Sequence, residues 1–227
     1  MYVDGSGPKV GSGFFLGEIL TTIPLPADEV KRSRAGCGKC SKCMTACPTN
    51  AFVGEHVLDA RKCISYLTIE NKGSIPHELR EPMGNRIYGC DVCQQVCPWN
   101  KFEWGDIAGS PLFGQVDLSV SAPKLQDLLL MSEDSFLQTF SSSPIKRIGL
   151  ARFIRNVAVA AGNSRNKLLV PVVEEALRAW AGKDEMVAEH LEWAKSRLMA
   201  ASGEEEATKK EGTQGGETKG EEQRRTE

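Results

Sequence analysis

The sequence predicts an α+β protein in which two folded modules precede a disordered tail. Three features of its 227 residues indicate this organisation. All eight cysteines lie between residues 37 and 97, apolar residues recur with helical spacing between residues 150 and 198, and residues 201–227 contain no large apolar side chain. With 41% hydrophobic and 26% charged residues, the chain has the composition of a folded protein of one or two small modules.

The cysteines form two closely spaced runs with one cysteine between them. The first run has the spacing Cys-x2-Cys-x2-Cys-x3-Cys-Pro and the second Cys-x2-Cys-x3-Cys-Pro. This spacing is typical of two [4Fe–4S] clusters, which need four thiolates each, so no cysteine remains for a disulfide. Zinc is the main alternative, but zinc knuckles do not require the third and fourth cysteines or the proline that follows them. The predicted metal ligands are Cys37, Cys40, Cys43, Cys47, Cys63, Cys90, Cys93 and Cys97.

The proline after each run predicts how the two clusters share these ligands. In two-cluster ferredoxins the cysteine before proline binds the other cluster, so the two runs should exchange their last ligands. Cys63 departs from the plain ferredoxin pattern, in which a ligand would lie three residues before Cys90. The expected sets are Cys37, Cys40, Cys43 and Cys97 for one cluster, and Cys90, Cys93, Cys47 and Cys63 for the other.

Two regions are expected in the first half of the chain. Residues 1–30 are punctuated by glycine and proline and contain a strand-like apolar run from Phe14 to Ile23 that ends at Pro24, so we expect them to be the remnant of a larger domain. Residues 31–105 are expected to form a double [4Fe–4S] ferredoxin-like domain. Short helices are predicted after Cys43 and at residues 59–66.

The second half of the chain has a helical pattern until residue 200. Apolar residues repeat at intervals of three, four and seven, which predicts three helices joined by short turns over residues 150–161, 168–180 and 187–198. Antiparallel helices of this kind resemble a HEAT-type unit, and residues 106–200 are expected to form a HEAT-like helical domain. Residues 201–227 cannot bury enough apolar surface to offset the entropy of ordering, so they are predicted to be disordered.

The charges of the helical part indicate a nucleic-acid partner. The net charge of the chain is −2, but the predicted tail alone contributes −3, which leaves +1 for the rest. No acidic residue occurs between Ser135 and Val173, and a one-signed surface suits a phosphate backbone. The alternative is an ordinary solvated helix face, although such faces usually alternate acids with bases. The residues predicted to bind nucleic acid are Lys146, Arg147, Arg152 and Arg155.

The absence of long apolar runs and of a disulfide pattern predicts the cellular setting. The longest apolar stretch, residues 13–20, is interrupted by Glu18 and is too short to cross a bilayer. Eight cysteines reserved for metal suit a reducing compartment. We therefore expect a soluble, cytoplasmic monomer with no membrane partner.

Several motifs between residues 13 and 200 resemble those of one known family. The longest are LDARKCISYLTIE at 58–70 and GNRIYGCDVCQQVCPWNKF at 84–102, and shorter ones lie at 14–19, 37–43, 47–51, 73–76, 143–147 and 155–160. On these motifs the chain resembles the epoxyqueuosine reductases, which are cobalamin- and iron–sulfur-dependent oxidoreductases of tRNA modification. The resemblance implies reduction of epoxyqueuosine to queuosine at the tRNA wobble position, the last step of queuosine biosynthesis. It implies that an external donor supplies electrons, which pass through the two clusters to cobalamin.

The resemblance also implies which residues face the cofactor and the substrate. In the family, an N-terminal α/β domain holds most of the cobalamin and the acidic proton donor, but only about a dozen residues precede Phe14 here. We therefore expect the chain to be the C-terminal part of such an enzyme, through truncation, a late start site, or a split arrangement with a separate cobalamin-binding N-terminal subunit. The catalytic proton donor is unknown. tRNA is the partner implied for the basic residues. The residues implied to contact cobalamin from the cluster side are Ser65, Lys72, Cys90 and Asp91.

Each of these contacts has a structural alternative. Ser65 could hydrogen-bond back within its own helix, Lys72 could be solvated, and Asp91 could cap a turn. The three histidines, which stand apart in the sequence, are expected at the surface or in packing. The alternative function is a non-catalytic double-cluster electron carrier that docks tRNA and depends on a separate cobalamin domain.

Overall fold

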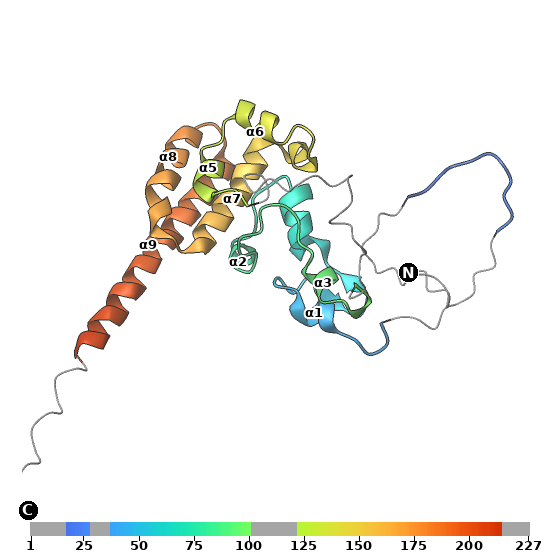
Figure 1. Cartoon of the computed structure of the whole chain (residues 1–227), viewed down its shortest axis with the longest axis horizontal. Coiled ribbons are helices and arrows are strands. Elements are labelled where there is room, and N and C mark those ends of the chain that lie inside the picture. The colour runs from blue at the N-terminus through green and yellow to red at the C-terminus, as the bar shows by residue number, and fades with distance from the viewer. Residues whose placement is uncertain (1–16, 28–36, 101–121, 215–227) are drawn as a thin grey trace, which may run out of the picture.

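Two groups of elements, one bearing the cysteines and one purely helical, make up the described part of the chain (Figure 1). The computed structural model describes residues 17–27, 37–100 and 122–214. We call residues 37–100 the cluster region and residues 122–200 the helical region. Among the described residues the fold is mostly helical, and its sheet is one antiparallel pair of short strands.

The cluster region consists of short elements separated by turns. β1 (Phe52–Gly54) pairs with β2 (Val57–Leu58) across a turn in which His56 has a positive φ of 59°. The 3₁₀ turn η1 (Ala60–Lys62) begins at Asp59, whose side chain accepts the Arg61 N–H. The remaining elements are α1 (Lys42–Ala46), the π-helix η2 (Tyr66–Glu70), α2 (His77–Arg80), α3 (Val92–Gln95) and the 3₁₀ turn η3 (Pro98–Asn100).

Both helices predicted in the cluster region are present, although the second is divided. The helix expected after Cys43 is α1, which contains Cys43. The helix expected at 59–66 is instead η1 followed by a helical stretch that becomes the π-helix η2, because the backbone at Cys63 between them is extended.

The helical region packs around three successive helices. These are α7 (Gly149–Ser164), α8 (Val170–Trp180) and α9 (Glu185–Gln214), and α9 lies against both of the others. They confirm the three helices predicted from the apolar spacing. The region also contains α5 (Leu125–Leu129), α6 (Glu133–Thr139) and the 3₁₀ turns η5 (Pro144–Ile148) and η6 (Lys167–Leu169).

The core of the helical region is aromatic at one end and tightly spaced at the other. The rings of Phe136, Phe140 and Phe153 have centroids 5.2–5.3 Å apart, in tilted arrangements that aromatic pairs prefer. Near the other end of α7, a Cβ added to Gly162 would lie 2.6 Å from the Trp193 ring. Glycine at this position therefore allows α7 and α9 to approach closely.

Two predictions about the ends of the chain differ from the structure. The strand expected from Phe14 to Ile23 is not formed in its described part, residues 17–23, where Ile19 and Leu20 are more than 90% exposed and have no partner strand. Disorder was expected from residue 201, but α9 continues to Gln214. Residues 215–227 lie outside the described part of the chain.

Candidate iron–sulfur cluster site

All eight cysteines lie in the cluster region with free thiols. Cys37 and Cys40 are exposed and the other six are half-buried. α1, which carries Cys43, packs against α3, which carries Cys93, so the two runs come together in space (Figure 1). This arrangement fits two clusters that exchange ligands between the runs.

Three cysteines of the second predicted set lie near one another. Burial raises the pKa of the Cys93 thiol, and the charges of Cys90 and Cys63 raise it further. Among the described residues, no three His, Cys, Asp or Glu side chains converge as ligands of a single metal ion do. A cubane needs a wider arrangement, because each thiolate binds a different iron at a different corner. Mutual repulsion of these thiolates is relieved when a cation binds them.

Cys47 lies in a small nest of hydrogen-bond donors. Burial opposes ionisation of its thiol, but the Ala51 N–H, with N and Sγ 3.3 Å apart, and the Thr49 hydroxyl favour the thiolate. Together the donors lower the pKa of Cys47. Hydrogen bonds to a ligating sulfur are one of the ways in which a protein tunes a cluster.

Ser65 and Thr68 connect the segment after Cys63 to the segment that carries Cys90. The Ser65 hydroxyl accepts the Cys90 N–H (3.0 Å) and donates to the Cys90 carbonyl (3.2 Å). The Thr68 hydroxyl accepts the Gly89 N–H (3.0 Å) and donates to the Ile64 carbonyl (2.7 Å). The alternative that Ser65 bonds back within its own helix is therefore wrong, because its hydroxyl holds Cys90.

The other residues predicted to contact cobalamin are at the surface. Lys72 is exposed in the loop after η2, and Asp91 is exposed at the start of α3, where its side chain does not cap the helix. Cys90, which is also a predicted cluster ligand, is half-buried. Ser65, Cys90 and Asp91 are thus neighbours in space, while their contact with cobalamin stays a prediction.

The prediction that Arg155 lies on an exposed basic face is wrong. Its side chain is fully buried, and its guanidinium donates to the carbonyls of Leu67, Asn71 and Gly73 and to the Asn156 side chain. No N–H of this group is left for a phosphate. The sequence pattern suggested one buried face for α7, but the helix is buried on nearly all sides because the loop after η2 covers the face that carries Arg155.

Arg152 is also directed inward, whereas Lys146 and Arg147 are exposed. The half-buried Arg152 guanidinium donates to the carbonyls of Ile69, Arg147 and Ile148. This position contradicts the expected surface face of α7. Arg147 is exposed and forms an ion pair with Glu70 (2.6 Å), and Lys146 is exposed beside it.

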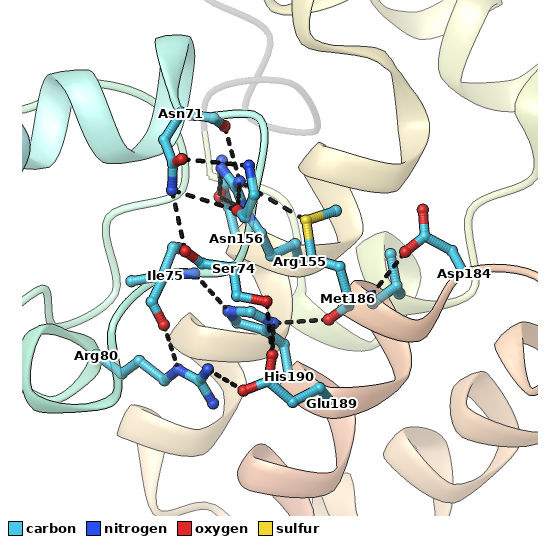
Figure 2. A network of polar contacts seen from close by, with 12 residues as sticks. Asn71, Ser74, Ile75, Arg80, Arg155, Asn156, Asp184, Met186, Glu189 and His190 are labelled. Carbon is cyan, nitrogen blue, oxygen red and sulfur yellow. Dashed lines mark hydrogen bonds and ion pairs between the residues drawn. The ribbon is translucent and has the colours of Figure 1, made fainter.

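The two regions also meet in a second set of polar contacts, between the 74–80 segment and α9 (Figure 2). Arg80 is buried, donates to the Ile75 carbonyl (2.9 Å) and forms an ion pair with Glu189, which also accepts the Ser74 hydroxyl (2.7 Å). His190 is buried, as its predicted packing role allows, and its Nε2 accepts the Ile75 N–H (3.1 Å). Burial lowers the pKa of His190 to about 4, so the ring is neutral at pH 7.

Sequence reasoning did not single out the residues that join the regions. Asn156, Thr68 and Arg80 are buried polar groups whose hydrogen-bond partners come from distant segments. The available signal was the pair Arg155 and Asn156 directly before the apolar run at residues 157–161, since buried polar residues are uncommon unless they have partners.

Comparison with known proteins agrees with this geometry. Residues 36–100 match the 4Fe-4S double cluster binding domain. Over 194 residues, covering 83% of this chain and 51% of the relative, the sequence is 50% identical to the epoxyqueuosine reductase of Pseudomonas aeruginosa. It is 47% identical to the enzyme of Escherichia coli over 190 residues, covering 82% of this chain and 47% of that protein. Over more than four fifths of its length the chain is thus similar to epoxyqueuosine reductases.

Solved structures of epoxyqueuosine reductases have the same fold. The structure from Streptococcus thermophilus matches 78% of this chain and 45% of its own with a TM-score of 0.64 and 27% identity. A crystal structure of epoxyqueuosine reductase with a tRNA-Tyr epoxyqueuosine-modified stem loop matches 72% of this chain and 51% of its own, with a TM-score of 0.53 and 29% identity. The chain spans about half the length of the curated epoxyqueuosine reductases that it matches.

The resemblance found in the sequence is therefore confirmed, and the double-cluster domain matches the cysteine spacing that predicted it. Within the part of the chain that the structure describes, no helix has the length and apolar character of a membrane span.

Proposed function

We propose that this chain is the iron–sulfur and helical part of an epoxyqueuosine reductase. In this function it supports reduction of epoxyqueuosine to queuosine in tRNA, with electrons passing from an external donor through two [4Fe–4S] clusters to cobalamin. The observation that carries the proposal is the arrangement of eight free thiols in a double-cluster domain, within a chain 50% identical to an epoxyqueuosine reductase. Removal of the epoxide oxygen as water consumes two electrons and two protons, which fits relay centres that pass one electron at a time.

The residues of the chain would position the redox groups rather than supply covalent chemistry. Eight thiolates would hold the clusters in the two sets expected from the sequence, and the Ser65 hydroxyl would fix Cys90 beside them. Cobalamin, when bound, supplies low-valent cobalt chemistry at the epoxide carbon. Ser65, Lys72, Cys90 and Asp91 would face it, and the contact of Ser65 with Cys90, next to Asp91 in the chain, supports this assignment for these three. The proton donor and most of the cobalamin contacts would come from a separate cobalamin-binding domain.

The helical region would serve as the tRNA side of the protein. α9 packs against both α7 and α8, an arrangement that supports the expected HEAT-like unit. Of the four basic residues first considered, Lys146 and Arg147 are the ones exposed, and they lie in η5, just before α7. A relative solved with a modified tRNA stem loop supports tRNA as the ligand.

The binding surface is tested by charge reversal at Lys146. If Lys146 contacts a phosphate, Lys146→Glu weakens tRNA binding and lowers the slope of log Kd against log salt by about 0.7–0.9. The matched control is Lys183→Glu, an exposed lysine in the turn before α9. Equal salt slopes for the two variants would remove η5 from the tRNA surface.

The activity is tested anaerobically with the reconstituted chain, cobalamin, a strong reductant and epoxyqueuosine-containing tRNA. Mass spectrometry of the digested nucleosides reads the product. We expect queuosine when the cobalamin-binding domain of a relative is added as a separate protein, and none with Cys90→Ser. If both clusters are intact and the added domain binds, yet no queuosine forms, the chain is instead an electron-carrying and tRNA-docking module.

A further inference from the structure

The buried Arg155 guanidinium is bound by backbone carbonyls instead of a carboxylate. Among the described residues no Asp or Glu forms an ion pair with it, and its three nitrogens donate to carbonyl oxygens of Leu67 (2.7 Å), Asn71 (2.8 Å) and Gly73 (2.6 Å) and to the Asn156 side chain. Burial lowers the pKa of Arg155 to about 10, so the group is still charged at pH 7. A buried charge is costly unless its donors are satisfied. The Arg155 guanidinium is therefore stable in this site only while these carbonyls stay in place, and it holds the backbone of residues 67–73 in one position.

Asn156, the next residue, holds the backbone at Thr68 and also that of a second segment, at Ile87. Its side-chain oxygen accepts from Arg155 (3.0 Å), and its amide nitrogen donates to the carbonyls of Thr68 and Ile87, both at 2.9 Å. Thr68 lies five residues after Cys63, and Ile87 lies three residues before Cys90. One side chain of α7 therefore holds both segments that carry these ligands.

The two segments are in turn joined at the ligands themselves. Ser65 and Thr68 bind Cys90 and Gly89 through the hydroxyl contacts described above. A continuous set of hydrogen bonds thus runs from α7 through η2 to the backbone N–H of Cys90. No described hydrogen bond joins α7 to residues 37–50, which carry the first run of cysteines.

We propose that Arg155 and Asn156 are positioning residues for one cluster, the one bound by Cys47, Cys63, Cys90 and Cys93. They act through the segments that carry Cys63 and Cys90, and they leave the other cluster unaffected. The inference rests on the cluster assignment in the proposed function. Its physical basis is that the direction of N–H groups near ligating sulfurs, and solvent access to them, set the stability and potential of a cluster. The helical region would therefore tune one of two otherwise similar redox centres.

Asn156→Asp and Asn156→Ala test the proposal in the full chain. The first keeps the side-chain volume but removes both N–H donors, and the second removes the side chain. The matched control is Asn163→Ala, because Asn163 lies on the same helix and also donates to two backbone carbonyls, those of Arg80 (2.7 Å) and Gly84 (2.8 Å). A general loss of stability would affect all three variants.

Two readouts are made anaerobically on protein reconstituted to about eight iron atoms per chain. The first is the rate of iron loss to a chelator, and the second is a redox titration followed by electron paramagnetic resonance. For the Asn156 variants we expect about half of the iron to leave roughly tenfold faster or more, in the range of measured outer-shell effects. One of the two cluster signals should shift in potential and shape, and the other should match the unaltered protein.

Several outcomes would overturn the proposal. These are wild-type kinetics in both Asn156 variants, equal changes in both cluster signals, or the same selective change in Asn163→Ala. If one Asn156 variant does not accumulate, hydrogen exchange is measured on the other. The proposal expects faster exchange in the peptide that contains Gly89 and Cys90 and unchanged exchange in the peptides of residues 37–50, and any other pattern overturns it. None of these readouts uses cobalamin or tRNA, so a chain that holds two clusters but makes no queuosine would count against the proposed function alone.

Discussion

The helical region and residues 37–62 obtain their order in different ways. In the helical region, large apolar side chains such as Phe136, Phe153, Ile154, Leu191 and Leu198 are almost wholly buried in one core. Residues 37–62 are all described, and Ala51 is the sole buried apolar side chain among them. Packing therefore explains the first region, whereas in the second the missing stabilisation has to come from metal ligation, as in other small metal-binding modules.

The strongest test of this comparison is removal of iron. When a chelator removes the iron under anaerobic conditions, we expect residues 37–62 to lose their structure while α7–α9 stay helical. The reason is that residues 37–62 depend on the clusters for their stability, whereas α7–α9 do not. Limited trypsin digestion with mass spectrometry should show rapid cleavage at Lys39, Lys42, Arg61 and Lys62, and circular dichroism should change little. Loss of both regions together would show that the two fold as one unit.

The converse test removes packing from the helical region. Phe153→Ala deletes a ring that packs on Phe136 and Phe140, and we expect a loss of about 3–5 kcal/mol in the free energy of unfolding. Chemical denaturation followed by circular dichroism measures it. The control Leu168→Ala, at a side chain that is 82% exposed, should change stability by less than about 0.5 kcal/mol. Similar losses in the two variants would contradict the packing argument.

A third test uses pH at the boundary between the regions. His190 has an ordinary pKa of 6.5 and a folded pKa of about 4, because burial disfavours the charged ring, with Arg80 and Arg155 nearby and Glu189 acting in the opposite direction. Because the unfolded protein binds a proton on this ring more readily than the folded protein does, protonation of His190 favours unfolding. Its contribution to the free energy of unfolding is therefore fully present above about pH 6.5 and is lost as the pH falls toward 4, by at most about 3 kcal/mol.

The free energy of unfolding measured from pH 7 to pH 5 checks this dependence. His190→Gln should flatten the dependence, because the buried ring with the lowered pKa is then absent. A pH profile that is the same for the wild-type protein and His190→Gln would show that this ring does not control it.

The smallest expected effect concerns the close approach of α7 and α9. In Gly162→Ala the added methyl would meet the Trp193 ring at 2.6 Å and the Ala194 Cα at 3.0 Å. We expect a net loss of about 1–3 kcal/mol from overpacking, despite the roughly 1 kcal/mol that alanine gains over glycine in a helix. Thermal unfolding measures it, with Gly54→Ala in the strand β1 as the control in the cluster region. A more stable Gly162→Ala protein would show that the helices adjust freely.

The sequence predicted what depends on spacing along the chain. The cysteine runs identified the cluster region, and the apolar repeat located α7, α8 and the start of α9 to within a few residues. Ligand spacing and helix periodicity are local properties, so they can be read before the fold is known.

The contacts between distant segments could not be predicted in the same way. Arg155 was placed on an outer face because the repeat of α7 marks one buried side and does not show what covers the other. The cover is a set of backbone carbonyls from residues 67–73, and carbonyls leave no mark on a sequence pattern. Buried polar partners of this kind are specified by the tertiary structure alone.

Trp193 lies where its fluorescence can report whether the cluster region and the helical region are in contact. Trp193 is 8% exposed on α9, and two side chains of the cluster region lie against its indole. The Arg80 guanidinium is 5.7 Å from the ring centroid, and the His77 ring, nearly perpendicular to the indole, has its centroid 6.2 Å away. If the 77–80 segment leaves α9, the indole loses a neighbouring cation and gains water. In a variant that keeps this tryptophan alone, its emission would serve as a built-in, label-free reporter of separation between the two regions.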